Sequence, residues 1–137
     1  MPTPYTIDAI DHVVLRVRDL ERAVAFYVDV VGCSVERRRD DLGLVHLRAG
    51  TSMIDLVHTT GRLGLRGGAA PGEEARNVDH VCLRIAPFDE AALMAHLAGH
   101  GVAPDGPASV NFGAQGDGAS LYFADPEGNV VELKARA

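Results

Sequence analysis

An eight-residue segment that contains a histidine occurs twice in the chain, and this internal repeat constrains the fold more than any other feature. Residues 10–17 read IDHVVLRV and residues 78–85 read VDHVCLRI, so His12 matches His80 at an offset of 80 − 12 = 68 residues. Five of the eight positions are identical, including the histidine, the aspartate before it and the arginine four residues after it. Apolar alternation alone would not reproduce those polar residues, so the sequence predicts two copies of one structural unit.

The segment that follows each copy has the pattern of a helix. Asp19 is the expected N-cap of the first helix, which shows apolar residues at spacings of three and four and ends near Gly32. The second helix is expected to begin at Asp89 and to end at Gly101. Both copies are therefore predicted to continue as strand followed by helix.

Each half closes with segments that have the pattern of strands. The predicted closing strands are residues 44–47 and 53–57 in the first half, and residues 121–123 and 130–133 in the second. The sequence DPEGN at 125–129 is a strong turn signal between the last two. Aligning the halves places Asp55 against Glu132, so each half has a histidine near its start and a carboxylate near its end.

These patterns divide the chain into two units with a connection between them. We expect a first module over residues 7–60, a glycine-rich linker over 61–77 and a second module over 78–135. Residues 103–118 are rich in Gly, Pro, Asp and Ser, and are expected to form a long loop, either a functional lid or a mobile structural loop.

Strand alternation sorts the repeated residues onto faces. His12 shares a face with Arg16, and His80 shares one with Arg84, while the apolar residues between them face a core. The matched carboxylates can point to the same sides as the histidines. Each such residue alone would be ordinary, but their recurrence in both halves predicts a four-residue site around one divalent metal ion: His12, Asp55, His80 and Glu132.

This set of nitrogen and oxygen ligands suits Ni, Zn, Mn, Co or Fe, and the sequence does not choose among these metals. Arg16 and Arg84 either bind a substrate carboxylate or neutralise the acids of the site, or they are solvated residues at strand ends. The other four histidines have no matching partner in the repeat. Cys82 lies in an apolar run and is expected to be a small core residue.

Composition excludes several classes of protein. The formal net charge is −6, from 19 acidic and 13 basic residues, which argues against a nucleic-acid partner. Uninterrupted apolar runs fall well short of the roughly 20 residues that a membrane span needs, and the N-terminus lacks the pattern of a secretory signal. We therefore expect a cytoplasmic protein with no membrane partner.

The repeated segments, the first helix (DLERAVAFY at 19–27) and the block YFADPEGNVVEL at 122–133 together resemble the vicinal oxygen chelate superfamily. This group includes glyoxalase I, fosfomycin- and bleomycin-resistance proteins, methylmalonyl-CoA epimerase and extradiol dioxygenases. The resemblance implies an α+β fold in which paired βαβββ modules form a curved, open-barrel sheet with helices outside. It also implies that His12, His80 and Glu132 bind the metal with Asp55 as fourth ligand, in a homodimer whose site lies within one chain or across two.

The function implied by the resemblance is that of a metal-dependent, glyoxalase-like lyase or isomerase, similar to lactoylglutathione lyase. The substrate would be a small molecule that chelates the metal through vicinal oxygens. Glu132 would act as general base, and Arg16, Arg84 and Tyr122 would bind the substrate.

Two departures from glyoxalase I count against the use of glutathione. Thr59 or Thr60 stands where an asparagine is expected, and residues 103–118 lack the basic residues that would hold the glycyl carboxylate of glutathione. A third departure concerns the metal: Asp55 stands where a longer glutamate is expected, a difference of about 1.5 Å, which leaves open whether Asp55 binds the metal directly. Two alternatives remain at this stage: an Fe(II) dioxygenase of the extradiol type that uses His12, His80 and Glu132, or a drug-binding resistance protein without catalytic activity.

Overall fold

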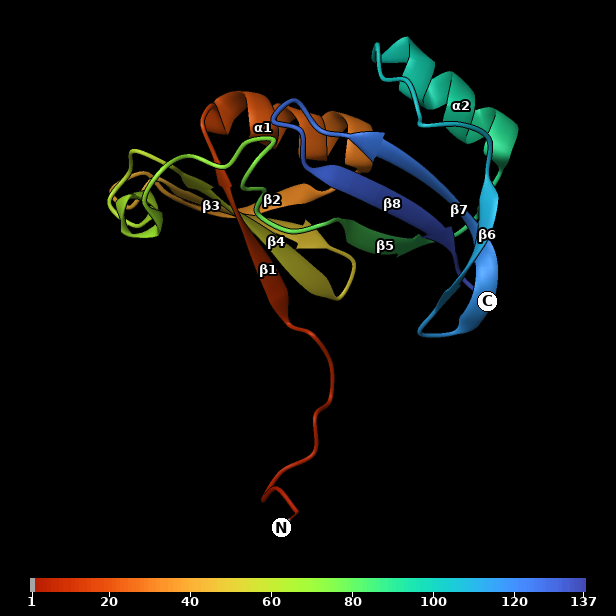
Figure 1. Cartoon of the computed structure of the whole chain (residues 1–137), viewed down its shortest axis with the longest axis horizontal. Coiled ribbons are helices and arrows are strands. Elements are labelled where there is room, and N and C mark those ends of the chain that lie inside the picture. Colours follow the sequence, from red (N-terminus) through yellow and green to blue (C-terminus); the bar gives the residue numbers. More distant parts are fainter. Residues whose placement is uncertain (1) are drawn as a thin grey trace.

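The computed structural model describes residues 2–137 and contains two four-stranded sheets joined in one chain (Figure 1). The first module consists of β1 (His12–Val17), α1 (Leu20–Phe26), a π-helical turn (Tyr27–Val31), β2 (Ser34–Arg39), β3 (Leu44–Ala49) and β4 (Ser52–His58). The second consists of β5 (Val81–Ile85), α2 (Glu90–Gly99), β6 (Ser109–Gly113), β7 (Gly116–Ala124) and β8 (Val130–Ala135). A short 3₁₀ helix, Gly64–Gly67, lies between them.

The two sheets have the same topology, which confirms the expected fold class of paired βαβββ modules. Their strand orders are β1-β4-β3-β2 and β5-β8-β7-β6. In each sheet the first strand pairs in parallel with the last, and the other neighbours are antiparallel. The register is also repeated, because Val14 lies opposite Asp55 as Cys82 lies opposite Glu132.

The predicted helix boundaries agree with the structure. The carboxylates of Asp19 and Asp89 accept hydrogen bonds from the backbone N–H groups of Arg22 (3.1 Å) and Ala92 (3.0 Å), as N-cap residues do. Gly32 ends the first helical segment with a φ of 97°, a conformation that favours glycine. These local signals are sufficient to set where the helices begin and end.

The expectation of a long loop over residues 103–118 is wrong. Residues 109–113 form the edge strand β6, and β7 already begins at Gly116. The composition conceals this hairpin because Gly113 and Gly118 leave room for a side chain from β8. A Cβ atom at position 113 would lie 2.7 Å from Cε of Lys134, so glycine lets the lysine side chain cross this strand although it weakens a strand.

One apolar core extends across both modules. Leu15 and Val17 of β1 are completely buried, as the alternation predicts. The ring of Phe26 in α1 lies 6.2 Å from that of Phe123 in β7, so the first helix also packs against the second sheet. In α2 only Leu97 is buried among the described residues, and Figure 1 shows this helix near one end of the molecule.

The turn at 125–129 connects the second module to the first. The buried carboxylate of Asp125 accepts a hydrogen bond of 2.8 Å from the hydroxyl of Tyr27. The carboxylate of Glu127 accepts hydrogen bonds from the backbone N–H groups of Arg18 and Asp19, at the start of the first helix. The turn at 125–129 is thus a contact between the two modules.

Asn77 adds a second connection next to this turn. Its side-chain oxygen accepts from the backbone N–H of Arg16, and its amide nitrogen donates to the carbonyl of Arg16 and to the side-chain oxygen of Asn129. A side chain that exchanges two hydrogen bonds with a strand extends the pairing of that strand. Asn77 therefore fixes β1 relative to the last turn of the second module.

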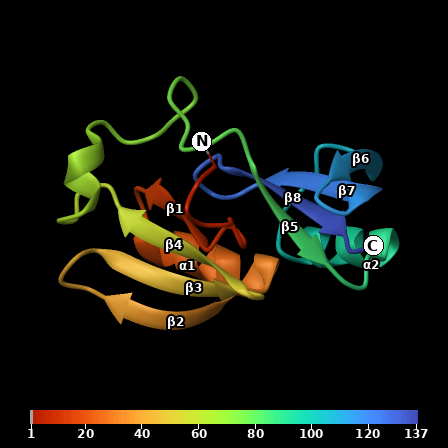
Figure 2. The same ribbon diagram turned by 90° about the horizontal axis from the view of Figure 1, so that it is seen from below.

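The two sheets lie side by side rather than face to face (Figure 2). The N-terminal residues before β1 run away from the body of the molecule (Figure 1). Within residues 2–137, the helices are too short or too polar to cross a bilayer.

Candidate functional site

Both repeated histidines are held in the same way by the aspartate that precedes them. Nδ1 of His12 lies 2.7 Å from Oδ2 of Asp11, and Nδ1 of His80 lies 2.7 Å from Oδ2 of Asp79. A carboxylate on one ring nitrogen orients the ring and leaves the other nitrogen free to bind a metal. The recurring Asp-His pair is therefore a repeat of local geometry as well as of sequence.

In the second module, His80 and Glu132 form a close pair. Nε2 of His80 lies 3.1 Å from Oε1 of Glu132, whose side chain is buried. β5 and β8 bring them together because these strands are parallel neighbours. We call the sheet face that carries His80, Cys82 and Glu132 the second face.

Tyr122, the expected substrate-binding residue, lies on the same face. Its ring is 5.7 Å from that of His80 in an edge-to-face arrangement, and it pairs with Glu132 across β7 and β8. A hydrogen bond to the Glu132 carboxylate raises the pKa of the Tyr122 hydroxyl above its ordinary value. The Tyr122 hydroxyl therefore keeps its proton at neutral pH and can donate a hydrogen bond.

The corresponding face of the first module, which we call the first face, carries His12, Val14 and Asp55. Asp55 is buried, and its Oδ1 lies 2.8 Å from Nδ1 of His46. The pKa of His12 is raised, first by its hydrogen bond to Asp11 and then by the charge of Asp55. His12 and Asp55 therefore interact electrostatically, while the direct hydrogen-bond partner of Asp55 is His46.

His46 is a site residue that the repeat did not reveal. It has no histidine counterpart in the second half, but it pairs with Asp55 as Tyr122 pairs with Glu132. The available signal was its position in β3, where alternation puts it on the polar side between Val45 and Leu47. Strand pairing, which a single sequence does not give directly, was needed to connect it with Asp55.

The four predicted ligands form two pairs and do not gather at one point in one chain. Within residues 2–137, no three His, Cys, Asp or Glu side chains come close enough to hold a metal ion together. The first face supplies His12 and Asp55, and the second supplies His80 and Glu132. Each module therefore presents half of the predicted set.

The chemistry of these donors fits a divalent metal of the first transition row. Two imidazoles and two carboxylates offer nitrogen and oxygen ligands. Cys82 is exposed on the second face, so the expectation that it is a core residue is wrong. Partial burial of its sulfur and the neighbouring Glu132 carboxylate raise the pKa of the Cys82 thiol to about 11, so the free thiol is protonated at neutral pH.

Arg16 is engaged by the backbone of the connecting segment. Its guanidinium group donates hydrogen bonds of 2.7–3.2 Å to the carbonyl oxygens of Gly64, Gly67, Gly68 and Ala69. A Cβ atom at position 67 would collide with the guanidinium group, which explains a glycine there. Arg16 thus holds residues 64–69 against the first module instead of presenting its donors to a ligand.

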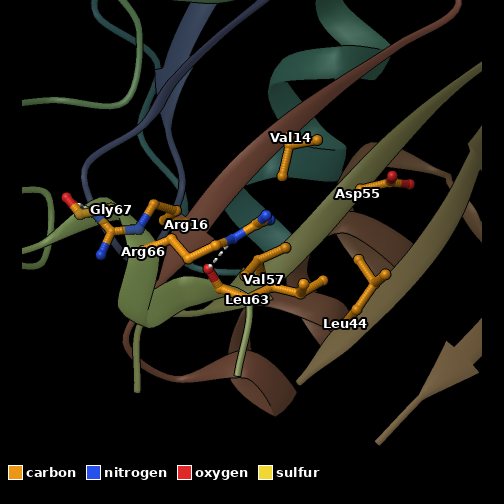
Figure 3. Close-up of a pocket in the computed structure, with 8 residues that line it drawn as sticks. All are labelled: Val14, Arg16, Leu44, Asp55, Val57, Leu63, Arg66 and Gly67. Atoms are coloured by element: carbon orange, nitrogen blue, oxygen red, sulfur yellow. Dashed lines mark hydrogen bonds between the residues drawn. The ribbon is translucent and has the colours of Figure 1, made fainter. Parts of the chain in front are cut away.

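The segment held by Arg16 closes one side of a pocket on the first face. Figure 3 shows Val14, Val57, Leu44 and Leu63 around this pocket, with Asp55 at its edge. The cavity has a volume of about 450 Å³, and its exposed lining is mainly apolar. Pockets of this size can take a small organic molecule.

Replacing Arg16 by Ala should loosen the connecting segment without unfolding the protein. The substitution removes five hydrogen bonds to partly exposed carbonyls, so we expect a loss of about 1–2 kcal/mol in stability. Hydrogen exchange should become faster in residues 64–69. Arg37→Ala, on the exposed edge strand β2, is the control, and equal exchange in the two variants would contradict the role given to Arg16.

Sequence comparison finds relatives along nearly all of the chain. The chain is 25% identical over 93 residues to the human protein "Methylmalonyl-CoA epimerase, mitochondrial", a match that covers 65% of this chain and 53% of the epimerase. It thus spans about half the length of that relative. It is 29% identical over 129 residues to "Virulence protein STM3117" of Salmonella typhimurium, covering 93% of this chain and 83% of that protein.

Solved structures show the same fold. The crystal structure of STM3117 superposes with a TM-score of 0.79 at 24% identity, covering 97% of this chain and all of the other. A lactoylglutathione lyase from Agrobacterium tumefaciens gives a TM-score of 0.66 at 22% identity, covering 97% and 96%. The family model described as "Glyoxalase/Bleomycin resistance protein/Dioxygenase superfamily" matches residues 9–133. This match covers both Asp-His segments and the turn at 125–129. The chain therefore belongs to the glyoxalase, bleomycin resistance protein and dioxygenase superfamily.

Proposed function

We propose that the protein is a divalent-metal-dependent lyase or isomerase that acts on a small substrate with vicinal oxygen atoms. The metal ligands would be His12, Asp55, His80 and Glu132. The observation that carries the proposal is the contact of 3.1 Å between Nε2 of His80 and Oε1 of Glu132, with the other ring nitrogen held by Asp79. An oriented imidazole beside a buried carboxylate is the arrangement of a metal-binding pair.

We infer that a homodimer completes the centre. One chain offers two ligand pairs on two sheets that lie side by side (Figure 2), so a twofold axis between copies can bring a first face against a second face. The operation that forms one such centre also forms the other. A dimer would therefore contain two equivalent centres.

The residues of the second face suit proton transfer next to a carbonyl group. When bound, the metal would polarise the two substrate oxygens and stabilise negative charge on them. The Glu132 carboxylate is buried and lies where it could take a proton from the adjacent carbon and return it to the neighbouring one. The protonated Tyr122 hydroxyl beside it could donate a hydrogen bond to an oxygen of the substrate.

The names of two relatives support this reaction class. One is called a methylmalonyl-CoA epimerase and another a lactoylglutathione lyase. Both identities are low, at 25% and 22%, so the substrates of these proteins are compounds to assay. The hemithioacetal of methylglyoxal and glutathione is the first compound to test, with Ni, Zn, Mn or Co added separately.

One observation favours a second candidate, an Fe(II) oxygenase. Oδ1 of Asp55 lies 2.8 Å from Nδ1 of His46. If this contact keeps Asp55 off the metal, the remaining ligands are His12, His80 and Glu132, a set of two histidines and one carboxylate. Oxygen consumption with catechols after anaerobic loading with iron distinguishes this reaction from isomerisation.

Metal content provides the direct test of the proposed centre. We expect the purified protein to retain one divalent metal per chain after dialysis, and His12→Ala to lose affinity for it by at least about 100-fold. His100→Ala, an exposed residue at the end of α2, is the control. Equal metal retention in the two variants, or a wild-type protein that binds none of the five metals, would contradict the proposal.

A further inference from the structure

The first and second faces correspond residue by residue, and they differ in character. Strand register defines the matched positions without reference to side-chain chemistry. The matched positions, first face then second, are Val14 and Cys82, Arg16 and Arg84, Leu44 and Ser120, Asp55 and Glu132, and Val57 and Lys134. The acidic position is kept in both faces, whereas Leu44 and Val57 of the first face are replaced by the polar residues Ser120 and Lys134 in the second.

The first face has an apolar region beside its carboxylate. Leu44 and Val57 are buried and line the 450 Å³ pocket together with Leu63. Arg16, the cation of β1 on this face, already donates to four backbone carbonyls. This face therefore has room for an apolar group, and the N–H donors of Arg16 are already used and do not bind an anion.

The second face carries two cations on neighbouring strands. Arg84 is exposed and lies directly opposite Lys134 in the pairing of β5 with β8. Lys134 is buried, and its Nζ donates to the carbonyl oxygens of Asn111 and Gly118. Throughout residues 2–137, no carboxylate lies within 4.0 Å of the charged nitrogens of either residue.

Three other basic residues of the sheets have carboxylate partners, whereas within residues 2–137 Arg16 and Arg37 form no such ion pair. Arg38, Arg39 and Arg48 each form an ion pair with a carboxylate. A buried ammonium group that has only carbonyl partners still lacks a counter-charge, which is costly in a poorly solvated position. The nearest acid along the strand is Glu132, which the proposed function assigns to the metal.

We propose that Arg84 and Lys134 bind the carboxylate of an organic acid substrate, and that the apolar part of the same molecule occupies the first-face pocket. This inference rests on the proposed function, because the two faces would meet at the shared metal. The planar guanidinium group of Arg84 offers parallel N–H donors that match the two oxygens of a carboxylate. The substrate class is therefore an acid with a short apolar chain, rather than a neutral compound.

Binding of simple probes to the full-length protein tests this inference. Hexanoate, 1-hexanol and inorganic phosphate are titrated into ¹⁵N-labelled protein at constant ionic strength, and amide shifts near Cys82 and Ser120 are followed. We expect hexanoate to bind at least about 10-fold more tightly than 1-hexanol, a difference of about 1.4 kcal/mol. Arg84→Gln should weaken hexanoate binding by a similar factor, and Arg37→Gln should leave it unchanged.

Several results would overturn the inference. Equal affinities for hexanoate and 1-hexanol would contradict an anion site at Arg84 and Lys134. Equal effects of Arg84→Gln and Arg37→Gln on hexanoate affinity would also contradict it. Tighter binding of phosphate than of hexanoate would overturn the assignment to a carboxylate.

Metal content of the same samples separates this inference from the proposed function. A protein that binds no metal but prefers hexanoate contradicts the proposed function alone. A metal-loaded protein without that preference contradicts this inference alone.

Discussion

A heterodimer of His12→Ala with His80→Ala should bind metal, although neither homodimer should do so. If each centre takes one ligand pair from each chain, the heterodimer contains one centre with both substitutions and one with neither. We therefore expect about half of the wild-type metal content per chain in the heterodimer, and almost none in either homodimer. Two affinity tags and tandem purification isolate the mixed species, and elemental analysis measures the metal.

The alternative of a centre within one chain gives a different result. Each chain of the heterodimer would then carry one damaged site, and the mixed species would bind as little metal as the homodimers. A heterodimer of His96→Ala and His100→Ala is the matched control, because both residues lie in α2, outside the proposed centre. Metal content near zero in the His12/His80 heterodimer would contradict a shared centre.

Much of the fold could be predicted because its signals are local. Asp19 and Asp89 cap the helices where the sequence places them, and the alternation around His12 and His80 gives the correct faces. β6 was missed because an edge strand needs few apolar residues, and its glycine makes room for Lys134 from a strand about 20 residues later. A local pattern does not contain that requirement.

The sequence predicted which histidine and which carboxylate belong to each half of the site. It did not predict how the two halves come together. The repeat identified His80 and Glu132, which are in contact. It also suggested that Arg16 could bind substrate, but the donors of Arg16 are used by carbonyls 48 to 53 residues away. The relative position of the modules depends on long-range contacts of the same kind, which sequence periodicity does not encode.

The contact between modules also predicts the largest loss of stability. Asp125→Ala should destabilise the protein by about 3–5 kcal/mol and lower its Tm by roughly 10–20 °C. The buried Asp125 carboxylate accepts four hydrogen bonds of 2.8 Å, from the Tyr27 hydroxyl, the backbone N–H groups of Glu127 and Asn129, and the Asn129 side chain. Alanine would leave these donors without their acceptor in a poorly solvated position.

Two further variants identify which of these donors matters. Tyr27→Phe removes one of the hydrogen bonds between the modules and should cost about 1–2 kcal/mol, because the turn itself keeps its three other hydrogen bonds to Asp125. Asp117→Ala, an exposed position on β7, is the control and should change stability by less than about 0.5 kcal/mol. Urea unfolding followed by circular dichroism gives the three values. If Asp125→Ala were no more damaging than Asp117→Ala, the turn would not be what joins the two halves, and the orientation of their ligand pairs would need another cause.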